Sequence, residues 1–195
     1  MAARAAAPES PPPPPPPATI AVDTNAGEAG LHAALVQRFG ESTVERRRLD
    51  VGDVVLTGGD SGAVVLIERK TWADLAKSLT DGRYAEQKAR LLSCVAAGCG
   101  ARAEEGDASE ASGEEAEAAG AARMPTRAVY IVEGALKGWA GAVGGHMGGL
   151  SKMKNARLEA AIVMTACRDG VPVLRSKDAA HTAELVGYLY SKLRE

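Results

Sequence analysis

The sequence predicts an α/β fold in which helices flank a mixed central sheet. Three observations support this fold class. Short apolar runs rich in β-branched residues recur along the chain. Stretches with helical spacing of apolar residues separate most of these runs, and glycines mark several of the boundaries. The expected order is strand, helix, strand, strand, helix, strand, helix, strand, helix.

One helix and three strands are expected before residue 69. Residues 18–23 (ATIAVD) form an apolar run that ends in a carboxylate, which is typical of a buried strand. Apolar residues recur with helical spacing across 29–39. Residues 42–56 alternate in part and predict one extended strand, whereas 63–68 (AVVLIE) are apolar enough for burial on both faces. The glycines of 57–62 predict the tight turn between these strands.

A long helix is expected directly after this last strand. Thr71 followed by Asp74 has the spacing of a capping box, in which each side chain bonds the backbone N–H of the other residue. Asp81 and Gly82 interrupt the helical pattern, which resumes over 83–96.

The second half of the chain repeats strand and helix. We expect strands at 127–133 and 171–175 and helices at 155–168 and 177–193. Pro172 places the last strand near a sheet edge or at a strand start, because proline cannot donate to a ladder. The glycine-rich residues 134–149 are expected to be irregular.

Two low-complexity segments bound one domain. Residues 1–18 are Ala- and Pro-rich, with an unbroken proline run, and predict a disordered tail. Residues 99–126 predict an acidic insertion whose composition cannot offset its ordering entropy. Apart from this insertion, 19–195 are expected to form the folded domain.

Charge and hydropathy limit the function classes. Outside residues 100–120 the chain carries 22 basic and 18 acidic side chains, a mild surplus that is compatible with a nucleic-acid partner. Membrane-spanning apolar stretches and a secretory signal pattern are missing from the sequence. We therefore expect a soluble intracellular protein without a membrane partner.

Three charged residues are expected to share one pocket. Asp53 and Glu68 lie at similar distances on either side of the predicted turn, so a hairpin would bring them together. Lys70 is two residues from Glu68 and therefore points to the same face of the strand. Asp23, at the end of the first strand, is a plausible third acid. Such carboxylates suit Mg²⁺, and a lysine beside them suits a phosphate.

Several motifs resemble a known family. The pattern Gly52-Asp53, fourteen residues, Glu68-Arg69-Lys70, three residues, Asp74 resembles the signature of the XPF family of structure-specific endonucleases. The run DLAKSLTDGRYAEQKARL, the strand YIVEG and the run GVPVLRS before the last helix are also similar to that family. The resemblance covers nearly all of residues 18–194, apart from the acidic insertion.

The resemblance implies a restriction-endonuclease-like core that cuts one strand of branched or flapped DNA, in repair or recombination, with Mg²⁺ or Mn²⁺. It implies metal ligation by Asp53 and Glu68 with help from Asp23. Lys70 would support the transition state, and Arg69 would orient the acids or the phosphate. It also implies a homo- or heterodimer formed through the last two helices. We expect such an enzyme to be nuclear.

Three basic residues are candidates for DNA binding. Arg83, Lys88 and Arg90 lie on or near the helix that follows the Glu68 strand. They are expected either to form a solvated helix face or to contact phosphates, which dominate DNA affinity.

Two other interpretations of the function stay open. One is a non-catalytic DNA-binding or scaffold subunit of a nuclease heterodimer, although Asp53, Glu68, Arg69 and Lys70 are all present. The other is a different nuclease with the same core fold, such as a junction resolvase or a nickase.

Overall fold

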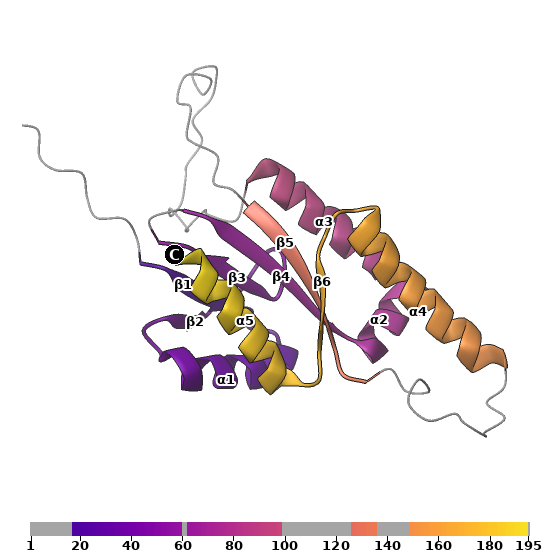
Figure 1. The fold of residues 1–195 in the computed structure, drawn as a ribbon, viewed down its shortest axis with the longest axis horizontal. Helices are drawn as coiled ribbons and strands as arrows, with labels where there is room; N and C mark the ends of the chain where they lie inside the picture. The colour runs from indigo at the N-terminus through magenta and orange to yellow at the C-terminus, as the bar shows by residue number, and fades with distance from the viewer. Residues whose placement is uncertain (1–16, 60–61, 99–125, 136–148, 195) are drawn as a thin grey trace, which may run out of the picture.

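The structure, a computed structural model, describes residues 17–59, 62–98, 126–135 and 149–194 (Figure 1). Most of the proline-rich tail (1–18), the acidic insertion (99–126) and the glycine-rich segment (134–149) lies outside these ranges. The predictions for these segments, and for the domain limits that depend on them, stay predictions.

A single six-stranded sheet forms the centre of the described fold, in the order β2-β1-β3-β4-β5-β6. Its strands are β1 (Thr19–Val22), β2 (Val44–Arg46), β3 (Val54–Thr57), β4 (Val64–Thr71), β5 (Thr126–Glu133) and β6 (Val173–Ser176). Strand β3 runs antiparallel to β1 and β4, whereas the other neighbouring pairs are parallel. The prediction of a mixed sheet is therefore confirmed.

Helices cover both faces of this sheet (Figure 1). On one face lie α1 (Ala29–Phe39), preceded by the 3₁₀ turn η1 (Ala26–Glu28), and α5 (Ala179–Leu193). On the other lie α2 (Trp72–Asp81), α3 (Arg83–Ala97) and α4 (Gly149–Cys167). Each face has its own apolar core cluster. None of the described helices is long and apolar enough to cross a bilayer.

The single extended strand predicted for residues 42–56 is wrong. The chain forms β2 on one side of β1 and β3 on the other side, so it must cross over between them. The N–H of Leu49 donates to Oδ1 of Asp23 over 2.9 Å and anchors this crossover. An uninterrupted strand cannot pair with both edges of β1, which is the physical reason for the break.

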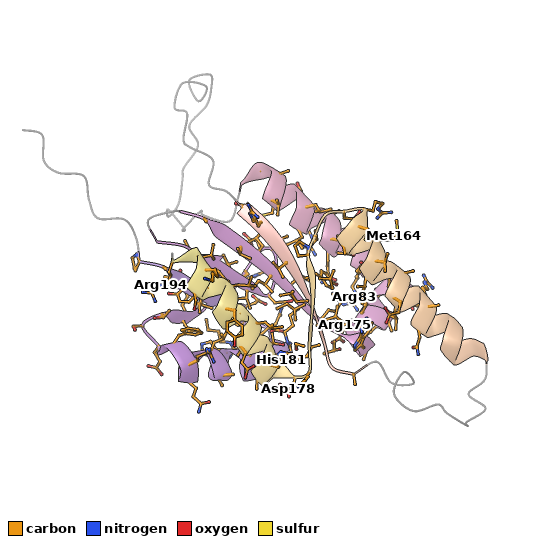
Figure 2. The ribbon with its side chains drawn as sticks, viewed as in Figure 1. Arg83, Met164, Arg175, Asp178, His181 and Arg194 are labelled. Atoms are coloured by element: carbon orange, nitrogen blue, oxygen red, sulfur yellow. The ribbon has the colours of Figure 1, made fainter. Side chains whose placement is uncertain are left out.

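The other elements follow the sequence more closely. Gly82 has a φ of 82° and separates α2 from α3, as predicted. Helix α4 is longer than expected, because it already begins at Gly149. Asp178 caps α5 by accepting from the N–H of His181 over 2.8 Å (Figure 2).

The predicted capping box is half formed. Thr71 Oγ1 accepts from the N–H of Asp74 over 3.1 Å, as expected for the N-cap of α2. The carboxylate of Asp74 accepts from the hydroxyl of Thr71 over 2.6 Å, whereas the prediction had it bond the backbone N–H.

Candidate active site

The β3–β4 hairpin brings Asp53 and Glu68 to the same place. Val54 pairs with Ile67 in the antiparallel register, which places Asp53 beside Glu68 one step further along. The N–H of Asp53 donates to the carbonyl oxygen of Ile67 over 2.8 Å, so the ladder reaches Asp53 itself. At the turn, the N–H of Gly58 donates to the carbonyl oxygen of Ala63 over 2.7 Å. The predicted hairpin is confirmed.

Gly52 allows this close approach of the two strands. Its φ is 79°, in the left-handed region that side chains disfavour. A Cβ at this position would lie 3.1 Å from the carbonyl oxygen of Ile67. The glycine that precedes Asp53 is therefore required by both backbone conformation and space.

Asp53 is a partly buried carboxylate held by the backbone of β4. Its Oδ2 accepts from the N–H of Arg69 over 2.7 Å. Burial, and then the negative charge of Glu68, raise the pKa of Asp53 to about 8. A carboxylate whose charge is disfavoured by a neighbouring carboxylate lies at a site that a cation would stabilise.

Lys70 lies on the same side of β4 as Glu68. Its Nζ is 3.3 Å from Oε1 of Glu68 and donates to Oε1 of Gln87, on α3, over 2.7 Å. The side chain of Lys70 is only 8 % exposed. Gln87 is a site residue that was not predicted from the sequence, although the Gln-x-x-Arg-Leu pattern in α3 contains it.

A polar cavity of about 190 Å³ opens at these residues. Its lining includes Asp53, Glu68, Gln87 and Arg90, with the remaining wall formed by Asp23, Asn25 and the crossover residues 49–52. An adjoining hollow of about 550 Å³ extends from Asp23 and Arg90 to Arg48. Acidic and basic side chains thus share one continuous depression.

Asp23 does not complete a cluster of three acids. It lines the cavity, but Oδ1 accepts from Leu49 N–H over 2.9 Å and Oδ2 from Asn25 N–H over 3.2 Å. Within the described part of the chain, no three His, Cys, Asp or Glu side chains are grouped to hold a metal. The carboxylate of Asp23 fixes the crossover and also lines the cavity, and its expected help in metal ligation stays a prediction.

The carboxylates of Asp53 and Glu68 fit Mg²⁺ or Mn²⁺. Mg²⁺ is commonly bound by one or two carboxylates together with waters and phosphate oxygens. Asp53 and Glu68 offer such a pair, at the wall of a polar cavity with room for these other ligands.

Arg69 does not point into the cavity. Its guanidinium lies on the opposite face, where Nη1 donates to Oε1 of Glu28 over 2.9 Å and Nε donates to Oε2 of Glu133 over 2.8 Å. Although burial opposes it, the hydrogen bonds from Arg69 and Thr182 lower the pKa of Glu133. The expectation that the Arg69 side chain orients the catalytic acids or a phosphate is corrected. Only its backbone N–H touches Asp53.

The three candidate DNA-binding residues have different surroundings. Arg83 is exposed and pairs with Asp81 over 2.8 Å (Figure 2). Arg90 has a 58 % exposed side chain and lines the cavity. Lys88 is buried, and its Nζ lies 2.6 Å from Oδ2 of Asp169. The expectation of a phosphate contact is corrected for Lys88, because this ion pair keeps its charge away from the surface.

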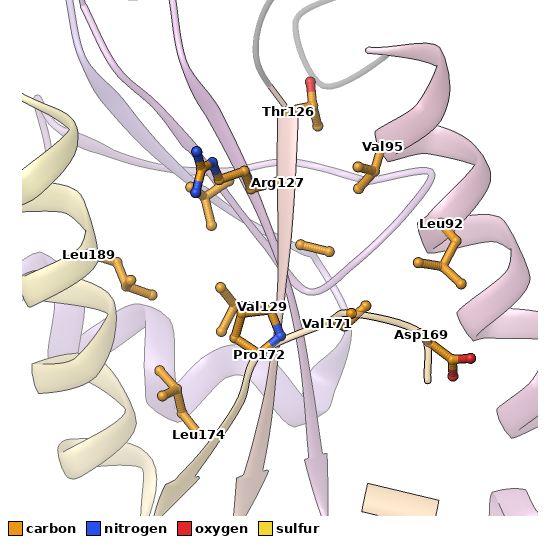
Figure 3. Close-up of a pocket in the computed structure, with 13 residues that line it drawn as sticks. Leu92, Val95, Thr126, Arg127, Val129, Asp169, Val171, Pro172, Leu174 and Leu189 are labelled. Carbon is orange, nitrogen blue, oxygen red and sulfur yellow. The ribbon is translucent and has the colours of Figure 1, made fainter. Parts of the chain in front are cut away.

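A separate cavity, of about 510 Å³, lies at the opposite end of β4 and β5 (Figure 3). Its walls are mainly apolar, with Leu92, Val129 and Leu189 contributed by three different elements. The charged residues among its lining are Arg127 and Asp169, and the latter is paired with Lys88. The chemistry of the molecule therefore centres on the smaller, polar cavity.

Comparisons with known proteins identify a family and similar folds. The model of the ERCC4 domain matches residues 22–189. The fold is similar to XPF from Aeropyrum pernix in complex with DNA, with 20 % identity, a TM-score of 0.55, and coverage of 89 % of this chain and 64 % of that one. The fold is also similar to a second structure, XPF from Aeropyrum pernix, with 23 % identity, a TM-score of 0.57, and coverage of 91 % of this chain and 62 % of that one.

The chain spans less than two thirds of the length of either solved structure. A comparison with curated protein sequences finds no match. The match to the family model, however, covers most of the chain and includes Asp53, Glu68 and Lys70. The chain therefore belongs to the ERCC4 domain family, that of the XPF-type structure-specific DNA endonucleases.

Proposed function

We propose that this chain is a divalent-metal-dependent endonuclease that cuts one strand of branched or flapped DNA in repair or recombination. The observation that carries the proposal is the meeting of Asp53 and Glu68 at one polar cavity, with the ammonium of Lys70 3.3 Å from the Glu68 carboxylate. The Aeropyrum XPF that was solved with DNA supports DNA as the partner of this chain.

Asp53 and Glu68 are the proposed ligands of Mg²⁺ or Mn²⁺. Such a cation, when bound, polarises a phosphoryl oxygen and activates water. The backbone N–H of Arg69 fixes Asp53 from one side. Burial and the charge of Glu68 both disfavour the ionised form of Asp53, and a bound cation would offset both effects.

Lys70 is the proposed electrostatic support for the reacting phosphate. Its Nζ contacts Glu68 and Gln87, both of which line the cavity. An ammonium fixed in this way neutralises charge that develops on the phosphoryl oxygens, without further reorganisation. Gln87 acts as the residue that positions this ammonium.

Arg90 is the proposed contact to the DNA backbone nearest the acids. It is exposed on α3, lines both the cavity and the adjoining hollow, and is 3.9 Å from Glu86, too far for a strong pair. Arg48 lines the far part of the hollow and would contact a neighbouring phosphate. Arg83, which is exposed but paired with Asp81, would contribute less.

We also propose a homo- or heterodimer formed through α4 and α5, in a nuclear protein. Among the described residues, the large apolar side chains that are exposed belong to these two helices: Val163, Met164 and Tyr188 (Met164 is labelled in Figure 2). Tyr188 is 64 % exposed. Their placement supports an interface there, since a partner would cover them.

The test uses labelled fork, flap, nicked-duplex and four-way-junction DNA, incubated with the purified chain and Mg²⁺, Mn²⁺ or EDTA. We expect one-strand cuts near the branch with either metal and none with EDTA. Asp53→Asn and Lys70→Met should each reduce the rate by a factor on the order of 10² or more. Glu41→Gln, which changes an exposed acid far from the cavity, is the control and should retain full activity.

The result also separates the second candidate function, a non-catalytic DNA-binding subunit. Tight binding to the fork without cleavage in either metal would indicate it. Full cleavage by Asp53→Asn or Lys70→Met would contradict the proposed catalytic centre.

A further inference from the structure

Tyr130 on β5 is a buried tyrosine whose hydroxyl has no hydrogen-bond partner among the described residues. The residue is only 3 % exposed. The other two buried tyrosines of the described chain are partnered: Tyr190 donates to the carbonyl oxygen of Ala18 and Tyr84 to that of Ala161, each over 3.0 Å. A buried hydroxyl without a partner is costly, so an acceptor brought within its reach would stabilise it.

The position of Tyr130 points to the active site. Strands β4 and β5 are parallel, and Tyr130 lies directly opposite Glu68 in their register. Neighbouring strands are about 4.8 Å apart, so side chains on one face at this register are in reach of each other. The ring of Tyr130 packs edge-on against Tyr84 of α3, with centroids 6.2 Å apart. Tyr130 thus lies on the α3 face, the face to which Lys70 and Gln87 also belong.

Electrostatics agrees with this placement. Burial, and then the negative charge of Glu68, raise the pKa of Tyr130, and Asp53 adds to the effect. The phenol therefore keeps its proton and serves as a donor. The nearby acids that would accept a hydrogen bond from this hydroxyl are the two carboxylates proposed to hold the metal.

We propose that Tyr130 is a positioning residue for Glu68, whose carboxylate accepts a hydrogen bond from the Tyr130 hydroxyl when it holds the divalent cation. This inference rests on the proposed function of Asp53 and Glu68. Carboxylates that ligate metals are commonly held by such outer hydrogen bonds, and loss of one weakens metal binding about 10- to 100-fold. Tyr130 does not line the cavity, so it acts through Glu68 and not on the DNA.

The test measures Mn²⁺ binding to the whole chain by isothermal titration calorimetry, together with the melting temperature. Tyr130→Phe should weaken Mn²⁺ binding about 10- to 100-fold, while the melting temperature is unchanged or raised because no existing hydrogen bond is lost. Tyr190→Phe is the matched control on the opposite face. It should lower the melting temperature, because it loses the bond to Ala18, but retain Mn²⁺ affinity.

Each outcome has a clear meaning. Mn²⁺ affinity of Tyr130→Phe within about twofold of the unmodified chain would overturn the role of Tyr130. So would an equal loss of affinity in Tyr190→Phe, which would indicate a general packing effect. Asp53→Asn tests separately whether the proposed metal site exists. If the unmodified chain and Asp53→Asn bind Mn²⁺ equally, the proposed metal site fails and this inference with it.

Discussion

Arg69 and Lys70 are consecutive residues whose charged groups lie on opposite faces of the central sheet. The guanidinium of Arg69 bridges Glu28 and Glu133 beside α1 and α5, whereas the ammonium of Lys70 lies between Glu68 and α3. The guanidinium of Arg69 stabilises the fold, whereas the ammonium of Lys70 belongs to the candidate active site. This division makes the two residues a matched pair for mutagenesis.

Arg69→Gln should mainly destabilise the fold. It leaves Glu28 and Glu133 buried without their cation, a change that typically costs about 3–5 kcal/mol. Lys70→Met should cost less, because Glu68 borders a polar cavity, yet it should abolish cleavage. Urea unfolding and fork cleavage measure the two effects. A larger loss of stability in Lys70→Met than in Arg69→Gln would contradict the assignment.

The stability of the metal-free chain should fall as the pH rises from about 4 to about 8. An aspartate in the unfolded chain titrates near its ordinary value of about 3.9, whereas folding raises the pKa of Asp53 to about 8. Between these values the unfolded state binds fewer protons than the folded state, so the free energy of unfolding decreases with pH and then levels off.

Asp53→Asn should remove this dependence. Asparagine still accepts from the N–H of Arg69 but carries no charge to bury. Between pH 4 and pH 8 the free energy of unfolding of Asp53→Asn should rise relative to that of the unmodified chain. The upper limit of this rise is about 1.4 kcal/mol for each unit by which folding raises the pKa of Asp53. Urea unfolding in EDTA at several pH values measures it, with Glu41→Gln as control. An advantage that stays constant from pH 4 to pH 8 would show that Asp53 is ionised throughout.

Local patterns predicted the centre of the site. The turn at 57–62 fixed the hairpin, and the two-residue period of a strand placed Glu68 and Lys70 on one face. The same period puts Arg69 on the opposite face, so the sequence already contained the evidence against a cavity role for its side chain. The predicted role of the Arg69 side chain was wrong because consecutive residues of a strand, such as Glu68, Arg69 and Lys70, cannot all point to one face.

Contacts between distant segments could not be predicted in this way. Lys88 is buried because Asp169, from the loop after α4, pairs with it. Gln87 reaches Lys70 only through the packing of α3 on the sheet. Asp23 is occupied by backbone N–H groups of a crossover whose path depends on the strand order. Periodicity describes one element at a time and contains no information on such pairings.

Arg90 and Lys88 should separate DNA binding from stability on one helix. Arg90→Ala should weaken binding to fork DNA and reduce the slope of log affinity against log salt by about 1, since one phosphate contact is lost. Lys88→Met should leave the affinity unchanged but lower the free energy of unfolding by about 1 kcal/mol, because Asp169 loses its bond to Lys88 but keeps Arg168. Fluorescence anisotropy at several salt concentrations and urea unfolding measure the two quantities. A salt slope that changes in Lys88→Met and not in Arg90→Ala would reverse the assignment.

Gly52→Ala should damage the site through the backbone alone. A side chain at its φ of 79° is strained, and the new Cβ would lie 3.1 Å from the carbonyl oxygen of Ile67, so we expect a loss of about 1–3 kcal/mol. Asp53 follows directly, so its displacement should also weaken Mn²⁺ binding. Gly30→Ala is the control, because a Cβ there has nothing within 4 Å, and alanine in α1 should stabilise by about 0.5–1 kcal/mol. Equal unfolding free energies and Mn²⁺ affinities for Gly52→Ala and the unmodified chain would show that this turn tolerates a side chain and does not position Asp53.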